Sequence, residues 1–322
     1  PPSLAAITPL SVVGGTHSTM RPGGIYNDGF ALEWITNVLD KAAPYGQGWE
    51  QARVDGGDTT CAENQLLHGQ KVDVVQKSEQ NPYYTDDVVK PLDPTDFAHE
   101  IEVPVFLVSS QQDEQTGPFY FTLLDQFTSA PITRFTIYNG IHPDGFAPQI
   151  LVEWKAFLDI YVAEEIPVID PLVRTLAPSL FQTVFDASLE IPPDRFASYA
   201  TFDEAKAAYE AEQPLRVIFE NGGGVDPGAP EGTHEIWFDS WPPPEQPPTR
   251  FYFQSDGSMT ATAPADVSAA SSFELDPEAG QRGIIAPGGD VWDKLPYYVW
   301  PQPSEGMAVV FETAPIADDL VM

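Results

Sequence analysis

Two apolar runs of strand length constrain the fold of this 322-residue chain most strongly. Residues 103–109 and 134–138 are nearly continuous hydrophobic stretches, as strands buried on both faces of a sheet are. A helix is expected over residues 119–127, between the two runs, and an amphipathic helix over 148–162, after the second. The order strand, helix, strand, helix predicts an α/β domain with a parallel sheet.

The residues before the first of these runs predict further elements. Residues 4–13 form an apolar stretch that we expect to be a short buried strand, and glycines and prolines then break it into a loop. Apolar residues at helical spacing predict a helix over residues 26–39. A polar stretch of weaker periodicity runs on to residue 99.

The composition and the hydrophobic pattern of the sequence change after residue 163. A connector rich in proline and alanine, expected to be helical, occupies residues 164–213. Beyond it, short β-like runs are separated by Gly/Pro-rich loops, a pattern typical of a sandwich or jelly roll. These runs are residues 215–219, 234–238, 250–253 and 307–311. We therefore divide the chain into an α/β domain (1–163), the connector, and a β-sandwich domain (214–322) that is expected to be incomplete.

The charge balance limits the partners of the chain. It has 48 acidic and 15 basic residues, a formal net charge of −33. The negative electrostatic field of such a charge repels nucleic-acid phosphates and anionic lipid headgroups. Neither a nucleic acid nor a membrane surface is therefore expected as a partner. The acidic residues are scattered, which favours a solvated surface over a device that steers cationic substrates. A surface of this kind suits extracellular or periplasmic conditions, and we expect such a location rather than the cytoplasm.

Cysteine content and apolar runs exclude other classes of protein. Cys61 is the only cysteine, so no internal disulfide and no cysteine-based metal site are expected. The histidines lack metal-ligand spacing, and neither a metal nor another cofactor is predicted. No apolar run reaches the roughly 18 to 20 residues of a membrane span. The chain begins at Pro1 without a leader, and we expect that a preceding part of the protein lies upstream.

Two residues that follow the predicted strands have the chemistry of an acid–base pair. Asp113 lies just past the strand at 103–109, and His142 lies just past the strand at 134–138. In an open α/β sheet the carboxyl ends of the strands line one crevice, so both side chains should project into it. A carboxylate that orients an imidazole is the acid–base half of a hydrolytic triad, although a loop cap and a turn residue would look the same in sequence.

The sequence contains no motif for the third member of such a triad. No Gly-x-Ser-x-Gly segment occurs, and the closest imitation, around Ser18, lacks the second glycine. His17, in the same glycine-rich loop, is interpreted as structural. The aromatic residues Tyr26, Phe30 and Trp34 are candidates for lining a substrate pocket, with a role in the core as the alternative.

Several segments together resemble the cocaine esterase and Xaa-Pro dipeptidyl-peptidase (CocE/NonD) family of α/β-hydrolases. Residues 1–34 are similar to the strand and the following loop that come one helix after the nucleophile elbow in this family. Residues 103–118 are similar to the strand that bears the acid of the triad. Residues 139–162 resemble the histidine loop and the last helix of the catalytic domain. Residues 215–257 resemble the start of the C-terminal jelly-roll, galactose-binding-like domain.

The resemblance implies a role for each part of the chain. Asp113 and His142 would be triad members, and the nucleophilic serine would lie upstream of these residues. Residues 22–99 would form a helical cap over the pocket, and residues 1–163 would be the C-terminal part of the hydrolase sheet. The connector is longer than the family pattern needs, and the sequence makes no prediction about oligomeric state.

The expected function is therefore hydrolysis of a small ester, amide or short peptide through an acyl-enzyme. The chain alone, without the upstream serine, is expected to be inactive. Release of X-Pro dipeptides is an alternative within the same class of enzyme. A second alternative, from a different class, is a non-catalytic remnant in which the β-sandwich is a binding module.

Overall fold

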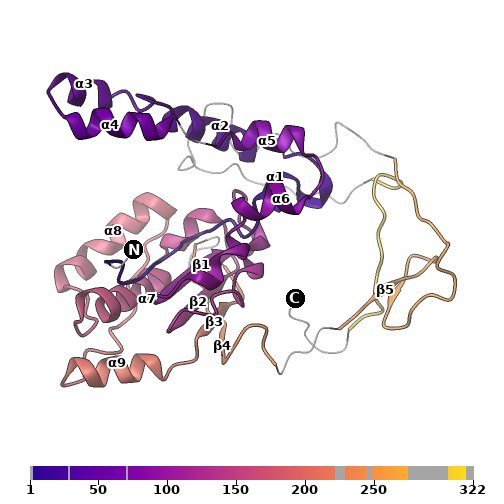
Figure 1. Cartoon of the computed structure of the whole chain (residues 1–322). Helices are drawn as coiled ribbons and strands as arrows, with labels where there is room; N and C mark the ends of the chain where they lie inside the picture. The colour runs from indigo at the N-terminus through magenta and orange to yellow at the C-terminus, as the bar shows by residue number, and fades with distance from the viewer. Residues whose placement is uncertain are drawn as a thin grey trace. The chain divides into compact units, whose positions relative to one another are not determined.

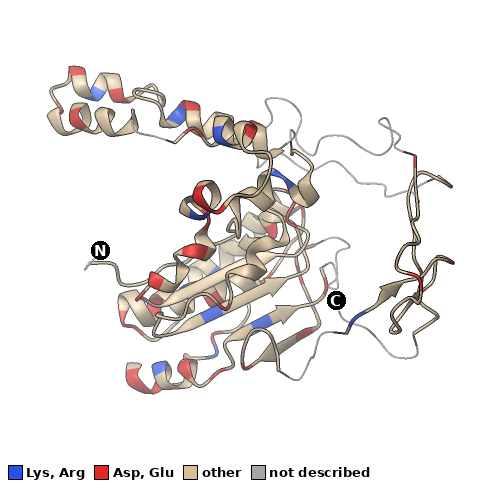
Figure 2. Ribbon diagram, turned by 45° about the vertical axis from the view of Figure 1, so that its right-hand side comes forward, with Lys and Arg blue, Asp and Glu red and all other residues tan. Residues whose placement is uncertain are grey.

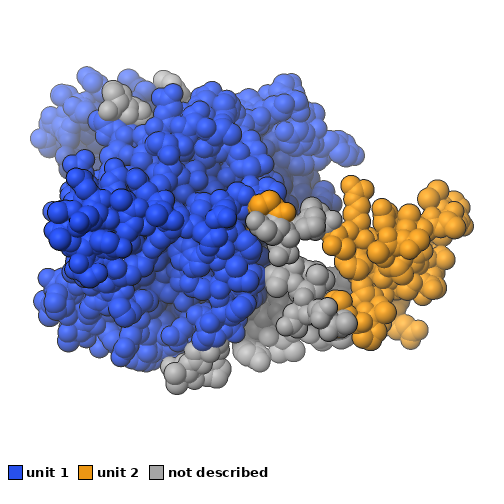
Figure 3. All heavy atoms as spheres, turned by 90° about the horizontal axis from the view of Figure 1, so that it is seen from below, with its two compact units in different colours: residues 1–242 blue, residues 243–322 orange. Residues whose placement is uncertain are grey.

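The computed structural model describes residues 3–27, 30–69, 72–221, 229–244, 249–274 and 304–316. The chain falls into two compact units, residues 1–242 and residues 243–322 (Figure 3). Within the described residues, the first unit contains a four-stranded sheet and the second a two-stranded sheet.

The sheet of the first unit is mostly parallel (Figure 1). Its strands are β1 (Val105–Ser110), β2 (Thr133–Tyr138), β3 (Leu215–Ile218) and β4 (Glu235–Phe238), in that spatial order. β1 pairs with β2 and β2 with β3 in parallel, whereas β4 is antiparallel to β3. The predicted α/β class with a parallel sheet is confirmed.

Both faces of this sheet are covered, which explains the continuous apolar runs of its strands. Phe106 and Val108 point to one face, where they pack against α7 (Pro148–Leu158) and α9 (Phe202–Glu210). Val105 and Leu107 point to the other face, where they pack against residues 120–127. Because neighbouring side chains in a strand alternate between faces, every position of β1 is buried.

The remaining helices come from the segments before β1 and after α7. Before β1 lie α1 (Thr16–Met20), α2 (Phe30–Ala42), α3 (Glu50–Asp55), α4 (Thr59–His68), α5 (Val74–Gln80) and α6 (Asp86–Val89), followed by short 3-10 turns. After α7 and a π-helical turn at Asp159–Ala163 lies α8 (Pro171–Phe185). The connector contains two helices, α8 and α9 (Phe202–Glu210), with a non-helical stretch between them. Side-chain hydrogen bonds cap the N-termini of several of these helices. At the start of α9, for example, Thr201 and Glu204 form a reciprocal capping box.

Two predicted elements differ in the structure. Residues 4–13 run parallel to β1 but make only isolated bridges, at Ile7 and Leu10, because Pro9 between them has no N–H to donate. The predicted helix over 119–127 is only a 3-10 turn, Pro118–Thr122, followed by further turns. The apolar residues of this segment are buried against the sheet without forming a continuous helix.

The place of β3 corrects the predicted boundary at residue 214. This strand was assigned to the β-sandwich, yet it pairs with β2 in the first unit, and the structural division falls after Pro242. All four residues of β3 are buried, as in a strand covered on both faces. The second unit contains β5 (Tyr252–Phe253) and β6 (Met259–Thr260), and residues 307–311 are not a strand. A jelly roll is not formed by its described residues.

The acidic residues are distributed over many elements. Figure 2 shows red segments on most helices and loops, with far fewer blue ones. This scatter matches the solvated acidic surface expected from the sequence. None of the helices in the described part of the chain combines the length and the apolar character of a membrane span.

Candidate active site

Two loops at the carboxyl ends of β1 and β2 contain the predicted pair. The acid loop, residues 111–117, contains Asp113, and the histidine loop, residues 139–147, contains His142. Because β1 and β2 are adjacent and parallel, both loops leave the sheet at the same edge.

Backbone hydrogen bonds fasten the start of the acid loop to the neighbouring strand end. Ser110 and Tyr138, the last residues of their strands, are paired in the sheet. Beyond them, Gln111 N donates to Tyr138 O at 2.9 Å and Gln112 N donates to Gly140 O at 3.1 Å. The two loops thus start from a fixed register.

Asp113 and His142 are in direct contact. The Nδ1 atom of His142 lies 2.9 Å from Oδ2 and 3.1 Å from Oδ1 of Asp113, within hydrogen-bond reach. The Asp113 side chain is fully buried, whereas the imidazole remains 25% exposed. The contact predicted from the sequence is therefore present, and the ring keeps a route to solvent.

The surroundings of Asp113 keep it ionised. Burial raises the pKa of this carboxyl, but the hydrogen bond and charge of His142 lower it, as do the N–H groups of Thr116 and Gln115. These two amides donate to Oδ1 at 2.7 and 2.8 Å. The net effect holds the pKa of Asp113 below its ordinary value. An ionised Asp113 accepts the Nδ1 proton of His142, which leaves Nε2 free to take up a proton.

Two tyrosines border the pair and remain neutral. Burial raises the pKa of Tyr120 and of Tyr138 above the ordinary value, and the charge of Asp113 raises both further. The Tyr138 hydroxyl lies 3.3 Å from Ile141 O, to which it donates. It therefore contacts the backbone of the histidine loop directly before His142.

The structure adds two carboxylates that the sequence reasoning missed. Glu114 follows Asp113, and its Oε2 accepts from the backbone N–H of His142 at 3.0 Å. Asp144 is 5% exposed, and its Oδ2 accepts from the N–H of Ile141 at 2.9 Å. Their closeness in sequence to Asp113 and His142 was the available signal, but acidic residues are common in loops.

Burial dominates the electrostatics of Asp144. It raises the pKa of this carboxyl to about 6, and the negative charge of Glu114 adds to the increase. The hydrogen bonds from Ile141 N–H and from the Asn221 side chain oppose the shift. The two buried aspartates of the site therefore have pKa values displaced in opposite directions.

The other sequence candidates lie away from this pair in their described contacts. Ser18 is within α1, and its hydroxyl donates to Gly15 O at 2.9 Å, as in a helical turn. The guanidinium of Arg21 lies over the ring of Tyr26, and Trp34 on α2 is 46% exposed. Phe30 is the first residue of α2 and is partly buried. Whether the three aromatic residues contact substrate stays a prediction.

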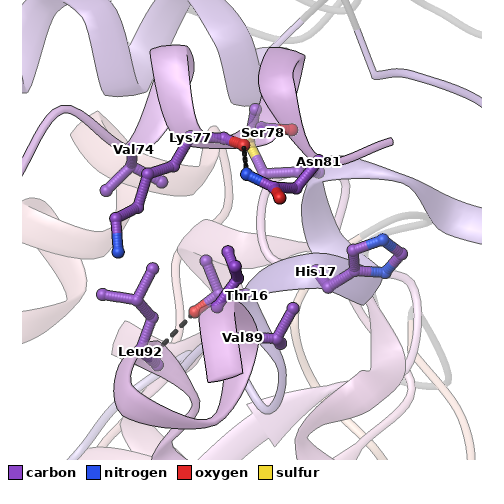
Figure 4. A pocket seen from close by; sticks show the side chains of 10 residues that line it. Thr16, His17, Val74, Lys77, Ser78, Asn81, Val89 and Leu92 are labelled. Carbon is purple, nitrogen blue, oxygen red and sulfur yellow. Dashed lines mark hydrogen bonds between the residues drawn. The ribbon is translucent and has the colours of Figure 1, made fainter. Parts of the chain in front are cut away.

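A small cavity lies between α1, α5 and α6 (Figure 4). Its volume is about 30 Å³, and its wall is mainly apolar, with His17 and Lys77 among the polar members. In Figure 4, the Thr16 hydroxyl donates to Leu92 O, and the Asn81 amide donates to Lys77 O. The lining residues are Thr16, His17, Met20, Val74, Lys77, Ser78, Asn81, Val88, Val89 and Leu92. None of the three aromatic candidates is among them.

The described residues contain no group of three or more His, Cys, Asp or Glu side chains arranged to hold a metal ion. What the site does contain is a buried, ionised aspartate bonded to a partly exposed histidine at the edge of a parallel sheet. This arrangement is able to orient an imidazole and to stabilise its protonated form.

Comparison with known proteins gives one structural likeness. The chain matches the crystal structure of a CocE/NonD family hydrolase from Staphylococcus aureus, with a TM-score of 0.48 and 13% sequence identity. The match covers 81% of this chain and 35% of that one, so the chain spans about a third of the length of that hydrolase. No protein-family model and no curated protein matches the chain.

Proposed function

We propose that this chain supplies the acid and the base of a serine hydrolase whose nucleophile lies outside these 322 residues. The observation that supports this most directly is the contact of 2.9 Å between His142 Nδ1 and the buried, ionised Asp113. The absence of a Gly-x-Ser-x-Gly segment from the sequence motivates the second part of the proposal.

In the proposed reaction His142 moves protons and Asp113 holds the ring. The serine oxygen attacks the carbonyl carbon of an ester or amide while its proton passes to Nε2 of His142. The proton then moves from Nε2 to the leaving group as the bond to that group breaks, which leaves an acyl-enzyme. Water next attacks the acyl carbon, gives a proton to Nε2, and releases the acid, and the proton returns to the serine. Asp113 stays ionised and stabilises each imidazolium.

We also propose the parts of the chain that would choose the substrate. Residues 22–99, which include α2 to α6, would form a cap, with Tyr26, Phe30 and Trp34 facing a small ester, amide or short peptide. Residues 243–322 would belong to a jelly-roll domain. These assignments rest on the family resemblance of the sequence, and no cofactor is needed for the chemistry.

The test uses the complete protein, with the upstream serine present, and a small aryl ester as substrate. His142→Ala should lower kcat by several orders of magnitude, since members of a triad act as a unit. Asp113→Asn should also be severe, because it leaves the ring in the wrong tautomer. KM should change little in both variants. His234→Ala, which removes an exposed histidine outside the proposed cap and the two loops of the site, is the matched control. A His142→Ala enzyme that keeps more than about a tenth of normal kcat would end the assignment.

Two further measurements separate the alternatives. Faster release from an X-Pro anilide than from the aryl ester would favour the dipeptidyl-peptidase alternative. The 322-residue chain alone should show no burst with an activated ester and no labelling by a serine-directed phosphonate. Stoichiometric labelling of Ser18 or of another serine in this chain would require a different mechanism.

A further inference from the structure

The backbone that leads into His142 is held by two carboxylates. The N–H of Ile141 donates to Asp144 Oδ2 at 2.9 Å, and the N–H of His142 donates to Glu114 Oε2 at 3.0 Å. Two consecutive amides are therefore each bonded to a charged side chain rather than to the backbone. Hydrogen bonds that involve a charged group are shorter and stronger than neutral ones.

Asp144 also connects the histidine loop to the segment that follows β3. Its Oδ2 accepts a second hydrogen bond, at 2.8 Å, from the side-chain amide of Asn221. Asn139, at the start of the loop, adds a parallel connection, because its side-chain amide donates to Phe219 O at 3.0 Å. The backbone N–H of Asn139 also donates to Ile218 O, at the end of β3, at 2.9 Å. The loop is thus joined to the end of β3 and to the residues that follow it, and Asp144 makes one of these connections.

The backbone of the loop approaches Asp144 closely at Gly140. A Cβ atom on Gly140 would lie 2.6 Å from Asp144 Oδ2 and 2.9 Å from the ring of Tyr138. Since real Cβ contacts are longer than this, only glycine allows the carboxylate to sit where it meets Ile141 N–H. The close fit indicates one defined position for the carboxylate.

The position of Asp144 is costly for stability alone. In the described part of the chain, no lysine or arginine forms an ion pair with Asp144 or with Glu114. A buried carboxylate without a cation is unfavourable, and burial correspondingly raises the pKa of Asp144 to about 6. An apolar side chain would avoid this cost but could not accept from Ile141 N–H, so the hydrogen bond calls for a role besides packing.

We propose that Asp144 and Glu114 are positioning residues for His142. By fixing the N–H groups of residues 141 and 142, they hold the imidazole at hydrogen-bond distance from Asp113. Productive geometry of this kind tolerates displacements of only about 0.5 Å. The functional meaning of the inference rests on the proposed hydrolase, in which the Nδ1 contact orients the ring.

The test reads the position of His142 without turnover, in the 322-residue chain itself. The Nδ1 proton of His142 should give a downfield proton NMR resonance, assigned by its loss in His142→Gln. In Asp144→Ala and in Glu114→Ala this resonance should vanish or exchange with water roughly tenfold faster or more, the effect of losing one hydrogen bond to a charged group. Asp144→Asn and Glu114→Gln keep an acceptor oxygen and should retain it.

The control is Asp125→Ala, because Asp125 is exposed and its side chain bonds only to the neighbouring Gln126 among the described hydrogen bonds. Circular dichroism shows whether each variant is folded, and Glu114→Ala provides the test where Asp144→Ala fails to fold. Folded alanine variants with an unchanged resonance and exchange rate would overturn the inference. The hydrolase proposal fails on a different measurement, the kcat of His142→Ala in the complete protein, so the two failures are distinguishable.

Discussion

Asp144→Asn should make the protein more stable at neutral pH. Asp144 is buried, and its pKa of about 6 lies well above the ordinary value of 3.8, first because of burial and then because of nearby Glu114. Asparagine has nearly the same shape, and its single oxygen can accept from both Ile141 and Asn221. The substitution therefore removes the buried charge while the two hydrogen bonds remain.

The magnitude follows from the linkage between proton binding and folding. The folded state binds the Asp144 proton more tightly than the unfolded state does, so stability falls as pH rises from about 4 to about 6. A pKa of about 6 against 3.8 corresponds to about 3 kcal/mol, lost in full above pH 7. Asp144→Asn should recover up to about 3 kcal/mol in the free energy of unfolding at pH 8 and little at pH 4.

Urea denaturation of the wild-type chain and of the variant at pH 4, 5, 6, 7 and 8 measures this difference. Asp125→Asn, a change at an exposed carboxylate, gives the background effect of losing one negative charge from an acidic protein. The reasoning is refuted if the difference in unfolding free energy does not grow between pH 4 and pH 7, or if the variant is the less stable protein at pH 8.

Two further substitutions test the site and the core. Asp113→Asn should show the opposite pH dependence. The lowered pKa of Asp113 stabilises the wild-type fold above about pH 4, and this contribution is lost as the pH falls through the lowered pKa. Urea denaturation should therefore find the variant destabilised at pH 7 and progressively less so in acid. A constant difference across that range would contradict the assigned cause. Phe157→Ala removes a fully buried ring between β1 and α7 and should cost about 3–5 kcal/mol in unfolding free energy. A cost below about 1 kcal/mol would mean that this cluster is not a packed core.

The acid–histidine pair was predictable because it depends on local signals. Each residue follows an apolar run of strand length, and parallel neighbours bring such positions to one edge of the sheet. This rule places the two residues at the same edge of the sheet, and the direct contact depends in addition on the loops that hold the two side chains. The expected contact between Asp113 and His142 is accordingly present at 2.9 Å.

The supporting contacts were not predictable for a physical reason. Asn221 and Asp144 are separated by 77 residues in sequence, and their contact depends on where β3 lies in the sheet. The sequence reasoning placed β3 in the wrong domain, because a buried four-residue run looks the same in a sandwich as at the end of a parallel sheet. Periodicity shows that a segment is buried but does not name the surface that buries it.

The register between β1 and β2 has a consequence for how this region tolerates changes of length. Ser110 faces Tyr138, and the acid and the histidine follow these residues by three and four positions. One residue added within either short stretch would displace a side chain by about 3.3 Å, the rise of one residue, which exceeds the length of the bond between them. Residues added at the exposed turn near Thr128, in the crossover between the strands, would leave both stretches unchanged. Natural or engineered variation in loop length is therefore expected to accumulate in the crossover, where the shape of the surface can change while the pair stays intact.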